Sequence, residues 1–257
     1  MPILLGTSGW QYRHWRDTFY PKGVAQARWL EFYAERFAVV ESNAAFYRLP
    51  ERRTFEAWRD RTPDDFVMAV KASRYLTHVK RLKDAEPSID LVIDRASGLG
   101  PKLGPVLLQL PPTFRIDVAR LRDALHPFPG DIRVAVEFRH RSWYTDEVRD
   151  LLTRARVALC LVDRRGPQTP MWRTTDWTYL RFHEGRASPR PCYGRTAMRS
   201  WVRRLSALWR RDEDVYAFFN NDPRACALRD ARVFALAARR DGWPVTRIPD
   251  AGDVQLG

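Results

Sequence analysis

Charged side chains occupy the ends of several short apolar runs in this sequence. One run carries Glu137 and Arg139, an earlier run contains Lys71, and another contains Glu41. A glutamate or lysine in a buried strand loses its hydration, so an opposite charge must offset the cost. A lysine–glutamate set of this kind can hold a phosphate group or perform general acid–base catalysis. It can also be an internal ion-pair network that only stabilises the fold, because structural networks shift pKa values as well.

The other apolar runs also deliver groups that can bind a ligand, transfer a proton or stack on a ring. We expect lysine and arginine to hold phosphate, aromatic rings to stack on a base or sugar, and glutamate to act as a base. The candidate catalytic residues are Glu41, Lys71, Glu137 and His183. The candidate ligand-binding residues are Ser8, Trp10, Tyr12, Asn43, Tyr47, Gln109, Arg139, Trp143, Asp163, Arg181, Asn220 and Asn221.

A divalent metal is a further candidate ligand. Four residues that follow successive apolar runs could surround such a cation, namely Glu137, Asp163, His183 and Asp222. Neither a His-x-His pair nor a His-Glu-x-x-His motif accompanies them, and no serine lies in a nucleophile elbow. The sequence therefore specifies no cofactor and leaves a divalent metal as an alternative.

The elements that must position these residues follow from the apolar pattern. Apolar runs predict eight strands, at residues 4–9 (with a turn), 39–46, 66–73, 106–110, 133–139, 157–162, 177–183 and 215–219. Helical spacing predicts helices at residues 25–37, 54–61, 88–97, 118–125, 146–155, 196–210 and 224–240.

Strands that alternate with helices form a parallel sheet with helices on its faces. Eight such units in 257 residues predict the α/β class, as a single (β/α)₈ TIM-barrel domain spanning residues 1–257. Its functional site should lie at the C-terminal ends of the strands. An open doubly wound sheet is the alternative, but the turn at residues 6–9 matches neither glycine-rich phosphate motif of such sheets. The crossover between the sixth and seventh strands is short of a full helix and should be irregular.

Strand parity predicts which side chains enter the barrel, because successive residues point to opposite faces. Val134 and Val136 should pack against the covering layer, whereas Glu137 should point to the other face. Lys71 should share the small-residue face of its strand, and we expect Glu41 or Glu137 to be its carboxylate partner.

The balance of charge suggests a class of partner. The chain has a formal net charge of +13 and a pI near 10.2. This favours DNA, RNA, an anionic membrane or a phosphate-bearing small molecule. Nearly all the basic residues are arginines, so a compositional bias could give the same charge without any function. No uncharged run reaches the length of a membrane helix, and we therefore expect no membrane span.

The cysteine pattern bears on the cellular compartment. Cys160, Cys192 and Cys226 are far apart and odd in number. The pattern argues against a disulfide framework and a zinc ribbon, and it predicts a reducing, cytoplasmic location. Cys160 lies inside an apolar run and should belong to the core. The sequence does not indicate an oligomeric state.

Five blocks in fixed order resemble a known family, at residues 6–21, 40–50, 103–114, 136–143 and 216–221. Together they resemble the YecE-like family, or domain of unknown function 72, over essentially the whole chain. The resemblance implies a TIM barrel whose reaction is not established. It also implies a barrel similar to those of the endonuclease-IV and xylose-isomerase group, whose members use metals at the strand ends. This chain lacks the histidine-rich set of a trinuclear zinc nuclease. It has His183-Glu184-Gly185 and Asp230-Ala231 where the family tends to have His-Gly and Asn-Ala.

Three functional hypotheses follow. The leading one is a protein that binds a phosphate-bearing ligand or nucleic acid at the C-terminal mouth of the barrel, with phosphodiester hydrolysis as its candidate reaction. The second is an enzyme that acts on a small sugar or sugar phosphate. The third is a non-catalytic binding module.

Overall fold

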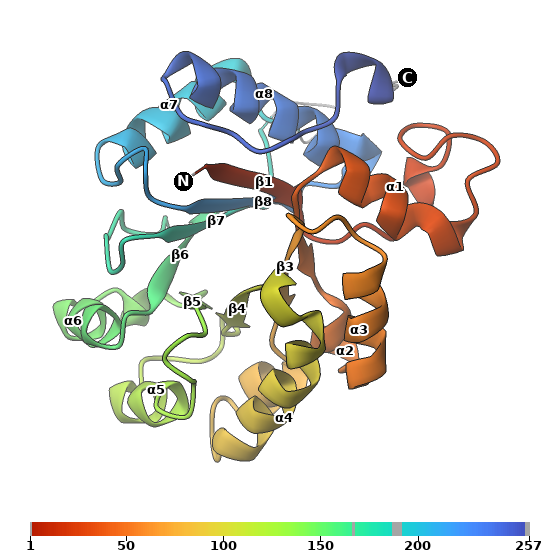
Figure 1. Ribbon diagram of the computed structural model, residues 1–257. Helices are drawn as coiled ribbons and strands as arrows, with labels where there is room; N and C mark the ends of the chain where they lie inside the picture. The colour runs from red at the N-terminus through yellow and green to blue at the C-terminus, as the bar shows by residue number, and fades with distance from the viewer. Residues whose placement is uncertain (1, 166–167, 187–191, 255–257) are drawn as a thin grey trace.

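The computed structural model describes residues 2–165, 168–186 and 192–254 of the chain. Eight parallel strands form one sheet in the order β1-β8-β7-β6-β5-β4-β3-β2, which curls into a nearly closed barrel (Figure 1). The predicted α/β TIM-barrel class is confirmed. The strands are β1 (Ile3–Thr7), β2 (Val39–Ser42), β3 (Val67–Lys71), β4 (Leu103–Gln109), β5 (Val134–Glu137), β6 (Ala158–Asp163), β7 (Thr178–Phe182) and β8 (Val215–Phe219).

Helices surround the barrel on its outside (Figure 1). They are α1 (Trp29–Arg36), α2 (Ala44–Tyr47), α3 (Arg52–Asp60), α4 (Glu86–Ala96), α5 (Val118–Leu125), α6 (Asp146–Arg154), α7 (Arg195–Ser206) and α8 (Cys226–Arg240). Each long helix buries an apolar stripe, as α7 does with Met198, Trp201 and Leu205. Between β6 and β7 the described residues contain no helix, which agrees with the irregular crossover expected there.

Alternate residues of each strand fill the barrel interior. Ala69, Ala135 and Cys160 belong to the interior apolar cluster, and the small side chains leave room for larger polar groups further along the strands. Val134 and Val136 pack instead in a separate cluster outside the barrel. The orientation predicted from strand parity is therefore confirmed for β5.

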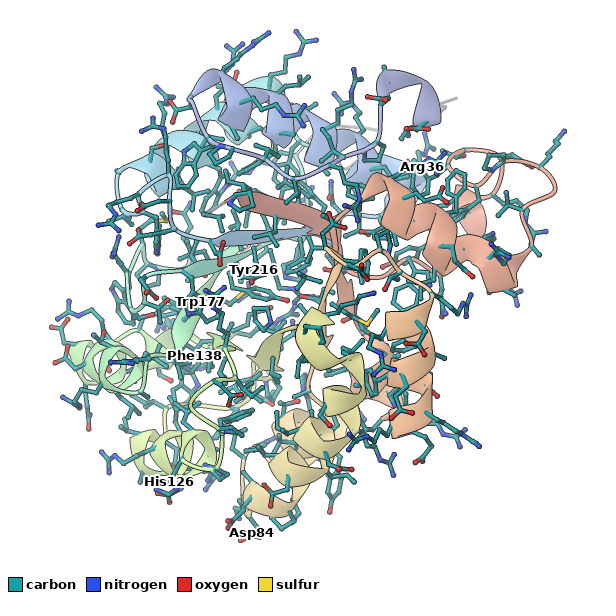
Figure 2. All side chains as sticks on the ribbon, viewed as in Figure 1. Arg36, Asp84, His126, Phe138, Trp177 and Tyr216 are labelled. Atoms are coloured by element: carbon teal, nitrogen blue, oxygen red, sulfur yellow. A yellow bond between two sulfur atoms is a disulfide. The ribbon has the colours of Figure 1, made fainter. Side chains whose placement is uncertain are left out.

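The N-terminal end of the barrel is filled by Arg133, Trp177 and Tyr216. The Cζ atom of Arg133 lies 5.4 Å from the ring centre of Trp177 and 5.8 Å from that of Tyr216. Its Nη1 atom donates to Oδ2 of Asp214 at 2.6 Å and to the hydroxyl of Tyr216 at 2.9 Å. Figure 2 places Trp177 and Tyr216 within the ring of strands. A ligand would therefore enter the barrel from its C-terminal end.

The seam between β1 and β2 is closed by a side chain. No strand ladder joins these two strands in the part of the chain that the structure describes. Instead, the hydroxyl of Tyr33 accepts from the Thr7 amide at 2.9 Å and donates to the Val39 carbonyl at 3.1 Å. A Cβ atom at Gly6 would lie only 2.1 Å from the same carbonyl oxygen, so this position requires glycine.

The predicted strand at residues 39–46 is too long. Strand β2 ends at Ser42, and Asn43 takes a helical backbone conformation with φ −92° and ψ −2°. The short helix α2 follows directly and buries Phe46 while leaving Tyr47 exposed. Apolar and aromatic residues suit both a strand and a helix, so a short run does not distinguish them.

The prediction that the cysteines form no disulfide is wrong. Cys192 and Cys226 are bonded, with their Cα atoms 5.0 Å apart, whereas Cys160 is a free, buried thiol. The two partners are 34 residues apart in sequence, and the packing of α7 against α8 brings them together. The cysteine pattern therefore no longer indicates a reducing compartment. Separately, none of the helices in the described residues has the length and apolar character needed to cross a membrane.

Candidate functional site

A pocket of about 380 Å³ opens at the C-terminal ends of the strands. It is lined by residues at the C-terminal ends of β3, β4 and β7 and by residues that follow β1, β2, β5, β7 and β8, so the barrel places distant parts of the sequence around one space. The predicted site residues that line it are Ser8, Trp10, Tyr12, Asn43, Tyr47, Lys71, Gln109, Arg139, Arg181, His183 and Asn220.

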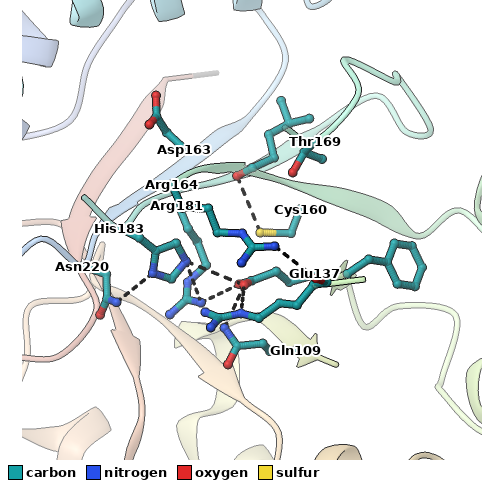
Figure 3. Close-up of polar contacts among 12 residues, drawn as sticks. Gln109, Glu137, Cys160, Asp163, Arg164, Thr169, Arg181, His183 and Asn220 are labelled. Atoms are coloured by element: carbon teal, nitrogen blue, oxygen red, sulfur yellow. Dashed lines mark hydrogen bonds and ion pairs between the residues drawn. The ribbon is translucent and has the colours of Figure 1, made fainter. Parts of the chain in front are cut away.

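A buried cluster of charges lies beneath this pocket. Arg181 of β7 bonds two carboxylates, with Nη2 at 2.7 Å from Oε1 of Glu41 and Nη1 at 2.6 Å from Oε2 of Glu137. Both glutamates are fully buried, and Arg181 is 1% exposed. The contact between Arg181 and Glu137 is drawn in Figure 3. Removing one member of such a set leaves a buried charge unpaired, which costs about 3–5 kcal/mol.

The remaining carboxylate oxygens are also occupied. Oε2 of Glu41 accepts from the Tyr179 hydroxyl at 2.7 Å. Oε1 of Glu137 accepts from Gln109 Nε2 at 2.9 Å and from Arg139 Nε at 2.8 Å. Burial alone would raise the pKa of Glu137, but the neighbouring cations hold that pKa well below its ordinary value. Neither glutamate lines the pocket.

His183 forms part of the pocket wall. Its Nδ1 atom lies 2.9 Å from Asn220 Nδ2, and its Nε2 atom lies 3.7 Å from Oε1 of Glu137 (Figure 3). Burial lowers the pKa of His183, and the charge of Arg181 lowers it further. The imidazole is therefore neutral near pH 7, where it can accept or pass on a proton.

Lys71 differs from its predicted arrangement. We expected Glu41 or Glu137 as its partner, but Arg181 bonds both carboxylates, and Lys71 has no ion pair in the described residues. Its Nζ atom instead lies 3.8 Å from the ring centre of Phe46. Burial and then the charge of Arg181 lower the pKa of Lys71 to about 8. The predicted contact between Lys71 and a glutamate is therefore wrong, although Lys71 and the two glutamates lie in the same region of the barrel.

The rim of the pocket carries polar atoms without protein partners. The Ser8 carbonyl accepts from Asn43 Nδ2 at 2.8 Å and from the Tyr12 hydroxyl at 2.6 Å. Ser8 Oγ, Asn43 Oδ1 and Arg181 Nε are buried and make no hydrogen bond within the described residues. Buried polar atoms normally have partners, so these three atoms are exceptions among the residues that line the pocket.

Three predicted ligand-binding residues do not line this pocket, namely Trp143, Asp163 and Asn221. Trp143 is fully buried, donates to the Phe114 carbonyl at 2.7 Å and stacks on Phe138 at 4.7 Å between ring centres. It therefore cannot stack on a ligand in this arrangement. Asn221 is 1% exposed and donates from Nδ2 to Asp230 Oδ2 at 2.7 Å.

The predicted metal set does not converge. Oδ1 of Asp222 accepts a hydrogen bond from Trp15 Nε1 at 2.6 Å, and its Oδ2 lies 2.7 Å from His14 Nε2. Asp163 bonds Trp201 and lines a separate pocket of about 550 Å³. Within residues 2–165, 168–186 and 192–254, no three His, Cys, Asp or Glu side chains are grouped so that they could hold a metal ion. The described residues therefore do not fit the divalent metal that the strand ends suggested.

Two neighbours of the candidate site residues, Tyr179 and Phe46, were not predicted from the sequence. Tyr179 bonds Glu41, and Phe46 lies beneath the Lys71 ammonium. Tyr179 is two residues before Arg181 on β7, so strand parity already places both on one face. No sequence pattern placed Phe46 beside Lys71, because its position depends on the helix α2, which forms where a strand was predicted.

Comparison with known proteins agrees with this architecture. The family model described as "Protein of unknown function DUF72" matches residues 4–251. UPF0759 protein YunF of Bacillus subtilis is 29% identical, over 86% of this chain and 89% of that protein. UPF0759 protein YecE of Escherichia coli K12 is 31% identical, over 55% of this chain and 50% of that protein. The crystal structure of the DUF72 family protein TM1631 from Thermotoga maritima superposes with a TM-score of 0.82 at 27% identity, covering 93% of this chain and 100% of that one. The resemblance noted in the sequence is confirmed, and the chain belongs to the DUF72 family.

Proposed function

We propose that the pocket at the C-terminal strand ends binds a small phosphate-bearing ligand. The observation that carries this proposal is the distribution of charge around the pocket. Lys71, Arg139 and Arg181 line it, whereas Glu41 and Glu137 lie beneath it. Three cations face two carboxylates in this group, which leaves one positive charge without a counter-charge. An anion in the pocket would supply that counter-charge.

Arg139 is the residue best placed to contact the phosphate. Its Nε atom is held by Glu137, and its side chain is 28% exposed. Its two Nη atoms make no hydrogen bond to protein in the described residues. A guanidinium fixed at Nε presents its outer nitrogens in a planar fork that suits phosphate oxygens.

The size of the pocket favours a small molecule. Its volume of about 380 Å³ falls within the range of roughly 300–1,000 Å³ that is usual for small-ligand sites. Single-stranded nucleic acid is the second candidate, because Tyr47 at the rim is 81% exposed and could stack on a base. The net charge of +13 also suits a polyanion.

The groups that can move a proton in this pocket are few. Glu41 and Glu137 do not line it, so they are unsuited to act as a base on the ligand. His183 and Lys71 line it, and the pKa of each is lowered by burial. An enzymatic reaction here, including phosphodiester hydrolysis, would therefore use one of these two side chains for proton transfer.

Calorimetric titration with ribose 5-phosphate and with ribose tests the proposal. We expect binding of the phosphorylated sugar only, and a loss of about tenfold or more in affinity for Arg139→Met, since a charge-assisted hydrogen bond contributes about 1.5–3 kcal/mol. Arg53→Met is the matched control, because Arg53 is exposed on α3 and does not line the pocket. Equal binding of both sugars, or an equal effect of the two variants, would overturn the proposal.

A salt titration tests whether the pocket binds single-stranded nucleic acid. Affinity for a short single-stranded DNA or RNA should fall steeply with salt if several phosphates are bound. Tyr47→Ala should weaken that binding while it leaves the affinity for ribose 5-phosphate unchanged. Absence of oligonucleotide binding would remove this candidate.

A further inference from the structure

Two of the five lysines in this chain are buried, and their surroundings differ. Lys102 is 6% exposed and Lys71 is 7% exposed. Nζ of Lys102 donates to the carbonyls of Arg59 at 2.6 Å and Thr62 at 2.7 Å, so its charge is solvated by the backbone. Nζ of Lys71 has no hydrogen bond and no ion pair within the described residues. Lys102 therefore has a structural role, whereas nothing in the fold requires the amine of Lys71.

Lys71 loses its proton more readily than an ordinary lysine. Burial and the charge of Arg181 oppose its charged form, whereas the ring of Phe46 beneath Nζ attracts that form. The pKa of Lys71 is lowered to about 8, mainly by burial. At pH 8, Lys71 is then unprotonated in about half of the protein molecules, whereas an ordinary lysine is almost fully charged there. Lys71 also lines the pocket, so a ligand can reach the amine.

We propose that Lys71 is an amine nucleophile that forms an imine with a phosphorylated aldehyde or ketone bound in the pocket. This inference rests on the proposed phosphate binding, because Arg139 would hold the phosphate while the carbonyl carbon faces Lys71. It also specifies the ligand class, which the charge of the pocket alone does not.

The reaction needs no oxidant and no further reactant. The neutral amine adds to the carbonyl carbon, a C–N bond forms, and the oxygen takes a proton to give a carbinolamine. Protonation of the new hydroxyl lets water leave, and a C=N bond forms. Overall, one carbonyl compound and one lysine ammonium give one protonated imine and one water. His183 lines the same pocket and is the candidate for passing the proton.

The site would stabilise the product of this step. The protonated imine carries the charge that the ammonium carried, and Glu41 and Glu137 attract a cation at this position. A protonated imine withdraws electrons from the neighbouring carbon, which weakens its C–H and C–C bonds. The class of reaction that follows from this chemistry is isomerisation or aldol-type cleavage of a sugar phosphate.

Reductive trapping tests the inference. The protein is incubated at pH 8 with dihydroxyacetone phosphate and sodium cyanoborohydride, and the adduct is located by peptide mass mapping. The five possible side-chain sites are Lys22, Lys71, Lys80, Lys83 and Lys102. We expect one adduct per chain, at Lys71, with a yield that is lower for unphosphorylated dihydroxyacetone and is reduced by inorganic phosphate.

Lys71→Arg, together with a binding measurement on the wild-type protein, separates this inference from phosphate binding. In the variant the adduct should fall below about a tenth of the wild-type yield because guanidinium stays protonated, while the binding of ribose 5-phosphate is measured on the wild-type protein. Lys22→Arg, at an exposed position, is the control and should leave the yield unchanged. Phosphate binding without an adduct at Lys71, or labelling spread evenly over all lysines, overturns the imine and leaves the proposed binding intact. Trapping with an abasic DNA oligonucleotide but with no small molecule overturns the assignment to a small ligand.

Discussion

Glu137 and Arg181 are bonded inside the barrel, with Nη1 of the arginine 2.6 Å from Oε2 of the carboxylate and both side chains almost fully buried. Glu41 approaches the other terminal nitrogen of the same guanidinium at 2.7 Å. One arginine therefore bonds two glutamates at once, one from β2 and one from β5. Arg139 shares Glu137 with Arg181, whereas Lys71 has no ion pair in the described residues, so the three cations outnumber the two carboxylates.

Arg181→Met should be strongly destabilising, because it leaves two buried carboxylates without their shared cation. We expect a loss of about 3–5 kcal/mol in the free energy of unfolding, measured by urea denaturation at pH 7. Arg52→Met removes exposed ion pairs to Glu56 and Asp94 and should cost less than about 1 kcal/mol. Similar losses in the two variants would show that the buried cluster contributes little.

The sequence predicted which residues belong to this cluster better than it predicted which of them bond one another. Parity placed Lys71 and Glu137 on the interior faces of their strands, because a strand repeats every two residues. The choice of Arg181 over Lys71 as the carboxylate partner depends on reach and angle across the barrel, which no local pattern encodes. A planar guanidinium can bond two carboxylates at once, whereas a lysine ammonium is a single point of charge.

Other differences between prediction and structure also arise from tertiary contacts. Trp143 was expected at the site because it follows β5, but it turns outward to stack on Phe138. The disulfide between Cys192 and Cys226 joins residues that only the packing of α7 on α8 brings together. Each difference concerns how side chains pack in the folded chain, whereas element type and order were predicted well from periodicity.

The acid stability of the protein should depend on Glu137. Its pKa in the folded state is well below the ordinary value of 4.5, so its contribution to stability is present above that pH and is lost as pH falls towards the lower folded pKa. The difference in unfolding free energy between wild type and Glu137→Gln should therefore shrink as pH falls from 6 to 3. Denaturation at several pH values measures it, with Asp64→Asn at an exposed position as control. A difference that stays constant with pH would contradict the assignment.

The hydroxyl of Tyr33 should control closure of the barrel between β1 and β2. Tyr33→Phe leaves the Thr7 amide and the Val39 carbonyl without their shared partner, which should cost about 1–3 kcal/mol. Hydrogen exchange at the Thr7 amide should also become faster, because this bond protects it. Tyr75→Phe removes a hydroxyl from a side chain that is 56% exposed and should change neither quantity. Unchanged exchange at Thr7 would mean that the seam does not need the hydroxyl.

Lys71 and Lys102 should respond in opposite directions to the same substitution. Lys71→Met replaces a desolvated cation over Phe46 by an apolar chain, and it should raise stability at pH 7 by up to about 3 kcal/mol. Lys102→Met leaves the Arg59 and Thr62 carbonyls without a donor and should lower stability. The folded pKa of Lys71 is about 8 against an ordinary 10.5, so the unfolded chain binds more protons between these values and wild-type stability recovers as pH rises.

The gain from Lys71→Met should therefore be largest below pH 8 and should fade towards pH 10.5. The same variant should lose affinity for ribose 5-phosphate, because a cation leaves the pocket. Stability that rises while binding is lost indicates that the lysine is kept for a ligand at a cost to the fold. Stability that rises with binding unchanged would instead favour a barrel network in which this amine has no function.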